Sequence, residues 1–181
     1  MQFINENKRD NQIVLPYSKQ IQFVAVGHTH MHITDKTEAQ INAMLVIAQK
    51  SARFFSRKFM QFCNGRKALK NMSHSNNPLI ISHLHTGNLN NASSTIHYHF
   101  AFGNLNNCIT EGDITLVFEE LWVNAAKQSG KKLWLQQANT DNKSWLYYGH
   151  RENKHGNLLG LDIFSTCIPH NAYATSLSSA L

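Results

Sequence analysis

Hydrophobic and polar positions along the chain predict four strands and two long helices. The strand-like segments cover residues 21–33, 79–85, 95–102 and 132–137, and residues 157–168 can supply a last strand. Several of them follow the two-residue period of a strand with one buried face. Residues 79–102 predict a hairpin with a long polar loop, because turn-forming residues separate the two strands.

Two further stretches follow the helical period. A capping box at Asp35–Glu38 predicts a helix that runs roughly to Phe62, with apolar residues at steps of three and four. Thr110 can cap a second helix, which Gly130 ends, and Asp141 can cap a short third one. The order strand, helix, hairpin, helix, strand, helix is not the alternation of a parallel sheet. It predicts an α+β fold, an antiparallel sheet with helices packed on it.

Composition narrows the class of protein. The 181 residues suit one globular domain, expected at 21–170 between an N-terminal arm (1–20) and a C-terminal tail (171–181). No segment approaches the roughly 20 apolar residues of a membrane span. The three widely spaced cysteines favour reduced thiols in a cytosolic protein. A net charge of +6 favours polyanionic partners such as nucleic acid.

Histidine is the unusual residue of this chain, with eleven copies that are internal and dispersed. In the predicted strand 95–102, His97 and His99 alternate with Tyr98 and Phe100, which are expected to point into the core, so the two imidazoles project together from the other face. Two nitrogen ligands with open positions suit a divalent cation that polarises a phosphate. His83 and His85 share a face of the neighbouring strand, and either can be a third ligand. His85 is favoured slightly, since it is nearer the turn.

A pair of adjacent tyrosines, Tyr147 and Tyr148, lies in the predicted third helix. A positioned tyrosine can attack a phosphodiester. Adjacent helical residues point about 100° apart, so only one of the two can face a given site. Arg151 shares a helical face with Tyr148 and can bind phosphate through two hydrogen bonds.

Together these segments resemble the HUH endonuclease superfamily, which includes rolling-circle replication initiators, relaxases and some transposases. The resemblance spans residues 21–168 and is carried by four segments: Phe23–Ile33, Ile96–Phe100, Phe118–Trp122 and Tyr148–Arg151. The chain is most similar to the short initiators of phages and plasmids. The resemblance implies a sheet of about five antiparallel strands flanked by helices, an HUH-like or RRM-like fold.

The resemblance also implies roles for single residues. His97 and His99 would be ligands of a divalent metal, Mn²⁺ or Mg²⁺, with His83 or His85 where the family often has Glu. Tyr148 aligns with the nucleophile, and Arg151 stands where the family usually has Lys. The implied activity is site-specific nicking and joining of single-stranded DNA, or of a DNA hairpin, through a 5′-phosphotyrosine. Such an enzyme would initiate rolling-circle replication of a phage or plasmid in the cytoplasm of a bacterial host cell.

Two other interpretations stay open. The basic C-terminal part of the first helical stretch and the residues just after it, with Phe54 and Phe62 nearby, could bind single-stranded nucleic acid without catalysis. The expected DNA contacts are Arg53, Arg57, Lys58, Arg66 and Lys67. The run His28-Thr29-His30-Met31-His32 is similar to the motif of histidine-triad nucleotide hydrolases, although Thr29 departs from it and the run comes early in the chain.

Overall fold

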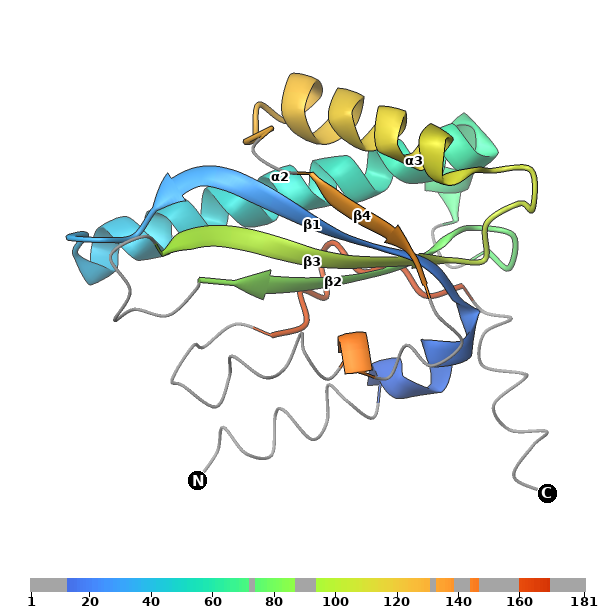
Figure 1. Ribbon diagram of the computed structural model, residues 1–181, viewed down its shortest axis with the longest axis horizontal. Helices are drawn as coiled ribbons and strands as arrows, with labels where there is room; N and C mark the ends of the chain where they lie inside the picture. The colour runs from blue at the N-terminus through green and yellow to red at the C-terminus, as the bar shows by residue number, and fades with distance from the viewer. Residues whose placement is uncertain are drawn as a thin grey trace.

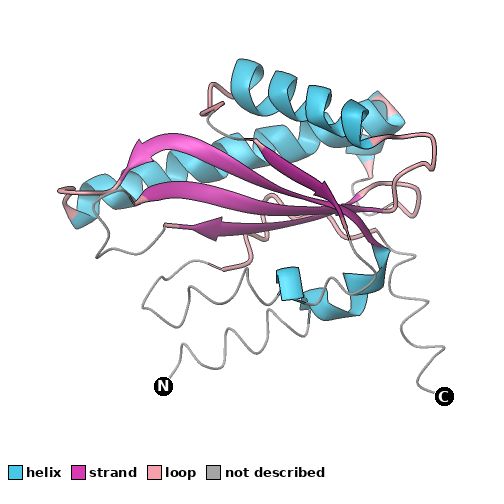
Figure 2. Cartoon of the chain, in the orientation of Figure 1, coloured by secondary structure: helices cyan, strands magenta, loops and turns pink. Residues whose placement is uncertain are grey.

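The described part of the protein is a four-stranded antiparallel sheet with its long helices on one face (Figures 1 and 2). The computed structural model describes residues 13–71, 74–86, 94–130, 133–138, 144–146 and 160–169. In chain order the elements are η1 (Leu15–Gln20), β1 (Ile21–His32), α2 (Glu38–Asn64), η2 (Arg66–Lys70), β2 (Leu79–His85), β3 (Thr95–Gly103), α3 (Glu111–Phe118), η3 (Glu119–Ala125) and β4 (Trp134–Gln137).

The strands lie in the order β2-β3-β1-β4, and every neighbouring pair is antiparallel. The predicted α+β class is therefore confirmed, but the described residues contain four strands rather than about five. Residues 160–169, which overlap the predicted last strand (157–168), follow the edge of β2 with two isolated bridges, Ile80 to Cys167 and His83 to Leu161. A turn interrupts the pairing between them, since the carboxylate of Asp162 accepts hydrogen bonds from Ser165 Oγ and the Phe164 amide.

The face of the sheet toward the helices holds an aromatic core. Tyr98 and Phe100 point into it from β3, as predicted, and both are fully buried. Phe55 of α2 packs on Phe100 with ring centroids 5.0 Å apart, and Trp122 of η3 packs on Phe100 at 5.5 Å. Bulky rings thus fix the helices to the central strands, which leaves the opposite face of β3 for other residues.

Both long helices begin with a capping box, one of them displaced from its predicted position. The cap of α2 is Thr37, not Asp35: Thr37 Oγ1 accepts from the Gln40 amide at 3.3 Å, and Gln40 Oε1 accepts from the Thr37 amide at 2.9 Å. Asp35 instead adopts a positive φ of 58° in the preceding turn. Thr110 caps α3 as predicted. Its continuation, the π-helix η3, ends at Ala125, before Gly130.

The second face of the sheet carries a smaller apolar cluster. It includes Val14 and Tyr17, which are buried beside Val24 of β1 and Leu146. The segment from residue 13 onward is thus an ordered helical turn on the sheet, where the sequence predicts part of a polar arm. Figure 1 shows η1 and the short helical segment 144–146 on this side, opposite α2 and α3. None of the described helices combines the length and apolar character that a bilayer crossing needs.

Candidate metal centre

Histidines gather on the face of the sheet that turns away from the long helices. The period of β3 sends Tyr98 and Phe100 to the aromatic core, and therefore sends His97 and His99 to the other side. In β2, Leu84 belongs to the aromatic core, so His83 and His85 share the face of the β3 pair. The sequence-predicted common face is observed.

Three of these side chains converge. His85, His97 and His99 each offer a ring nitrogen, and the three atoms lie within 4.8 Å of one another. The ring centroids of His85 and His99 are 4.3 Å apart, and those of His97 and His99 are 5.1 Å apart. His85, slightly favoured over His83 from the sequence, is thus the residue that completes a three-histidine group able to hold a metal ion.

Two more histidines flank this group through strand register. His28 of β1 lies directly opposite His97, with stacked rings 5.6 Å apart. His83 lies directly opposite His99. The sequence left open the role of the run 28–32, and the structure separates its members. A register irregularity lies between His28 and His32, and His30 and His32 are exposed whereas His28 is half-buried.

Burial keeps the central imidazole neutral. The pKa of His99 is far below its ordinary value, first because the ring is buried and then because His85, His97 and other histidines repel its charged form. Burial also lowers the pKa of His28. A neutral imidazole retains the lone pair that a metal ion requires. His99 is therefore held in the protonation state that a metal ligand requires.

A backbone hydrogen bond sets the tautomer of His97. Its Nδ1 lies 2.9 Å from the carbonyl oxygen of Thr95. A carbonyl oxygen can only accept, so the ring proton is on Nδ1 and the lone pair is on Nε2. Metal-binding histidines commonly have their second ring nitrogen held in this way, which orients the ring.

The cover over the cluster is uneven. Trp145, from the segment 144–146, lies on His99 with ring centroids 5.1 Å apart, and it stacks on Trp134 of β4 at 5.0 Å. Leu161 bridges to β2 at His83. His85 and His99 are buried, whereas His97 and His28 are only half-buried. Among the described residues, the cluster is therefore least covered on the side of His97 and His28.

Among the described residues, the predicted DNA contacts are not brought to this cluster. Tyr147, Tyr148 and Arg151 lie outside the described residues. The predicted DNA contacts of α2 and η2 are described and exposed, but α2 covers the opposite face of the sheet from the histidines (Figure 1). These contacts are Arg53, Arg57, Lys58, Arg66 and Lys67. One strand of DNA that follows the outer surface of α2 would have to pass around the sheet to reach His97.

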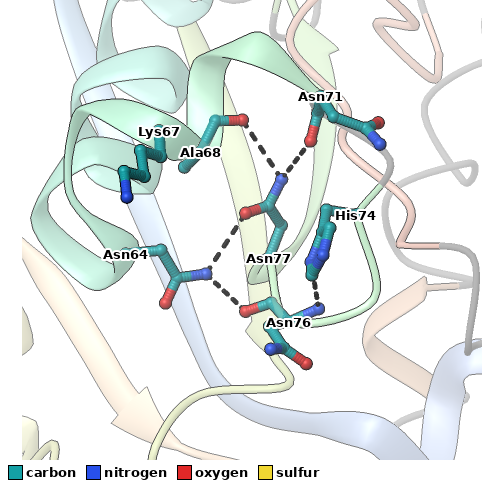
Figure 3. A pocket seen from close by; sticks show the side chains of 7 residues that line it. All are labelled: Asn64, Lys67, Ala68, Asn71, His74, Asn76 and Asn77. Atoms are coloured by element: carbon teal, nitrogen blue, oxygen red, sulfur yellow. Dashed lines mark hydrogen bonds between the residues drawn. The ribbon is translucent and has the colours of Figure 1, made fainter.

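A separate pocket of about 360 Å³ lies where η2 leads toward β2 (Figure 3). Buried Asn77 shapes its wall by donating to the carbonyl oxygens of Ala68 and Asn71 at 3.3 and 2.8 Å. The pocket is at the start of β2, whereas His85 is at its end, roughly 20 Å away at the rise of a strand. Lys67 thus lines a site distinct from the histidine cluster; the remaining lining residues are Asn64, His74 and Asn76.

Comparison of the chain with models of known protein families, with curated proteins and with solved structures gave no significant match. The functional argument therefore depends on the residues themselves.

Proposed function

We propose that this protein is a metal-dependent endonuclease that cuts single-stranded DNA by transferring a phosphodiester to Tyr148. The observation that carries the proposal is the convergence of His85, His97 and His99 on one face of the sheet, within 4.8 Å of each other and accessible beside His97. The HUH resemblance supplies the reaction class, and the cluster supplies the chemistry that this class needs.

The donor set favours a first-row transition ion. The group contains three imidazoles, and imidazole suits Zn²⁺, Cu²⁺, Ni²⁺ and iron, whereas Mg²⁺ prefers oxygen ligands. Of the two ions expected from the sequence, only Mn²⁺ is a transition ion, and a site of three imidazoles suits Zn²⁺ or Fe²⁺ better than either. Held by His85, His97 and His99, such an ion would act as a Lewis acid toward a phosphate oxygen. Three protein ligands leave positions for substrate, as in catalytic rather than structural sites.

The contact of Trp145 with the cluster supports the assignment of the nucleophile to the segment that follows it. Trp145 lies on His99, and Tyr148 follows it by three residues in the sequence. Three residues of extended chain span at most about 10 Å. This contact is the support for assigning the nucleophile to the segment that contains Tyr148 and Arg151.

The proposed transfer of the phosphodiester to Tyr148 requires no reactant other than the DNA and the protein. The phenol oxygen of Tyr148 forms a bond to phosphorus, and the bond from phosphorus to the DNA 3′ oxygen breaks. The phenol proton passes to solvent, and the departing oxygen gains a proton to become a 3′ hydroxyl. Arg151 would bind the non-bridging oxygens, where negative charge accumulates. Attack of a 3′ hydroxyl on the phosphotyrosine reverses the step and joins strands.

Metal binding is tested by thermal unfolding with and without Mn²⁺ or Zn²⁺. An ion at 100 times its dissociation constant stabilises the fold by about 2.7 kcal/mol, which is roughly 5–10 °C in Tm for a domain of this size. The variant with both His97→Ala and His99→Ala should lose this shift, and the exposed His30→Ala should keep it. An equal shift in the double variant would refute the site.

Covalent trapping tests the nucleophile. Incubation with single-stranded oligonucleotides and Mn²⁺ should give a protein–DNA adduct, which mass spectrometry places on Tyr148. Tyr148→Phe removes one hydroxyl and should abolish the adduct, while Tyr147→Phe should keep most of it. A nucleotide found on Tyr147, or cleavage with no adduct, would contradict the assignment.

One observation favours a second candidate function, non-catalytic binding of single-stranded nucleic acid. Phe54 and Phe62 are 38% and 48% exposed on α2, and Lys58 Nζ lies 5.8 Å from the Phe54 ring centroid. Exposed rings beside cations can stack bases and neutralise phosphates. Cleavage of a bound oligonucleotide separates the two candidates. The nucleotide-hydrolase alternative gains no such support, because only His28 of its motif lies in the cluster.

A further inference from the structure

A pair of tryptophans extends from the histidine cluster to the edge of the sheet. Trp145 lies on His99, and Trp134 stacks on Trp145 with an angle of 20° between the ring planes. Strand register places Trp134 on the histidine face, since it lies opposite Val26, which itself lies opposite His99. The three rings thus form a row from His99 on β3 to Trp134 on β4, and β1 lies between these two strands.

The outer member of the row is accessible. Trp134 is 40% exposed, although tryptophan is usually well buried. The strand that carries it, β4, is the edge of the sheet, with the described neighbour β1 on one side. One face of the indole is held by Trp145. A ring that is fixed on one side and open to solvent is a preformed surface for another flat ring.

We propose that Trp134, supported by Trp145, is a stacking platform for a nucleobase of single-stranded nucleic acid. For the nature of its ligand this inference rests on the proposed function. Base stacking on tryptophan is tolerant of sequence and is a common device of single-strand binding proteins. The net charge of +6 provides the matching attraction for the phosphates.

The spacing of the row suits a base next to the reacting phosphate. Trp134 is two strands from His99, which corresponds to about 10 Å at the usual strand separation. The distances between ring centroids, 5.1 Å from His99 to Trp145 and 5.0 Å from Trp145 to Trp134, likewise limit the separation of Trp134 from His99. A phosphate held at the cluster and a base held on Trp134 would therefore belong to the same short stretch of nucleic acid. The platform would orient that stretch, so Trp134 is a positioning residue.

The test compares an oligothymidine with an abasic oligomer of equal length, which has the same phosphates and no bases. Fluorescence anisotropy in EDTA measures affinity without metal or cleavage. Wild-type protein should prefer the oligothymidine, and Trp134→Ala should weaken its binding roughly 5- to 150-fold, the value of one stacked base. Binding of the abasic oligomer should hardly change. Trp134→Phe keeps a ring and should retain most of the preference.

Phe164 provides a matched control, because it is an exposed aromatic residue (62%) in the segment along the opposite edge, beside β2. Phe164→Ala should leave both affinities unchanged. If the Trp134→Ala variant keeps the wild-type preference for the oligothymidine, or binds both oligomers more weakly by the same factor, the stacking platform is refuted. This outcome is distinct from failure of the proposed function, because loss of metal-dependent cleavage would leave the comparison in EDTA unaffected.

Discussion

Acidification should destabilise the metal-free protein through His99. This side chain is 4% exposed, and its pKa is lowered first by burial and then by His85, His97 and the other cluster histidines. An unfolded chain takes up a proton on histidine near pH 6.5, whereas folded His99 stays neutral. The stability that follows from this difference is fully present above pH 6.5 and is lost as the pH falls below it.

The size of the effect follows from proton linkage. When the pH falls from 7.5 to 5.5, one histidine that remains neutral in the folded protein lowers the free energy of unfolding by about 1.4 kcal/mol. That is a substantial part of the 5–15 kcal/mol typical of a domain. Burial lowers the pKa of His28 as well, so the pH dependence of the whole cluster should exceed that of His99 alone.

Urea unfolding in EDTA at the two pH values measures this cost. His99→Gln should reduce the difference between them by about 1.4 kcal/mol, and the control His30→Gln, at an exposed position of β1, should leave it unchanged. Any constant destabilisation by the substitution cancels, because each variant is compared with itself. The same pH dependence in wild type and His99→Gln would show that burial does not hold this ring neutral.

Two other substitutions test the supports of the site. Gly27→Ala places a Cβ 3.0 Å from Trp122 Cε2, among buried rings, and should lower the free energy of unfolding by about 1–3 kcal/mol through overpacking. A free energy of unfolding in urea as high as that of the wild type would contradict this packing. Tyr98→Phe removes the buried 2.8 Å hydrogen bond to Asp162 and should also cost about 1–3 kcal/mol, with faster proteolysis of the segment along β2 as a local readout. An unchanged cleavage rate of that segment would argue that the hydrogen bond from Tyr98 does not hold Asp162 and its segment against the sheet.

Local sequence patterns determined the elements that carry the site. The two-residue period of 95–102 predicts that His97 and His99 share a face while Tyr98 and Phe100 enter the core, and β3 has this arrangement. Alternation is a property of every extended strand, so it can be predicted without knowledge of the fold. The same rule gave His83 and His85 a common face.

Only the tertiary structure decided which histidines meet. Register between strands sets His28 opposite His97 and His83 opposite His99, and register depends on turns and core packing far along the chain. The row of Trp134, Trp145 and His99 joins residues from three separate segments, so no local period could reveal it. The missing last strand has the same kind of cause. Residues 160–169 have a strand-like composition, but the hydrogen bonds of Asp162 form a turn that pairs with β2 only at its two ends.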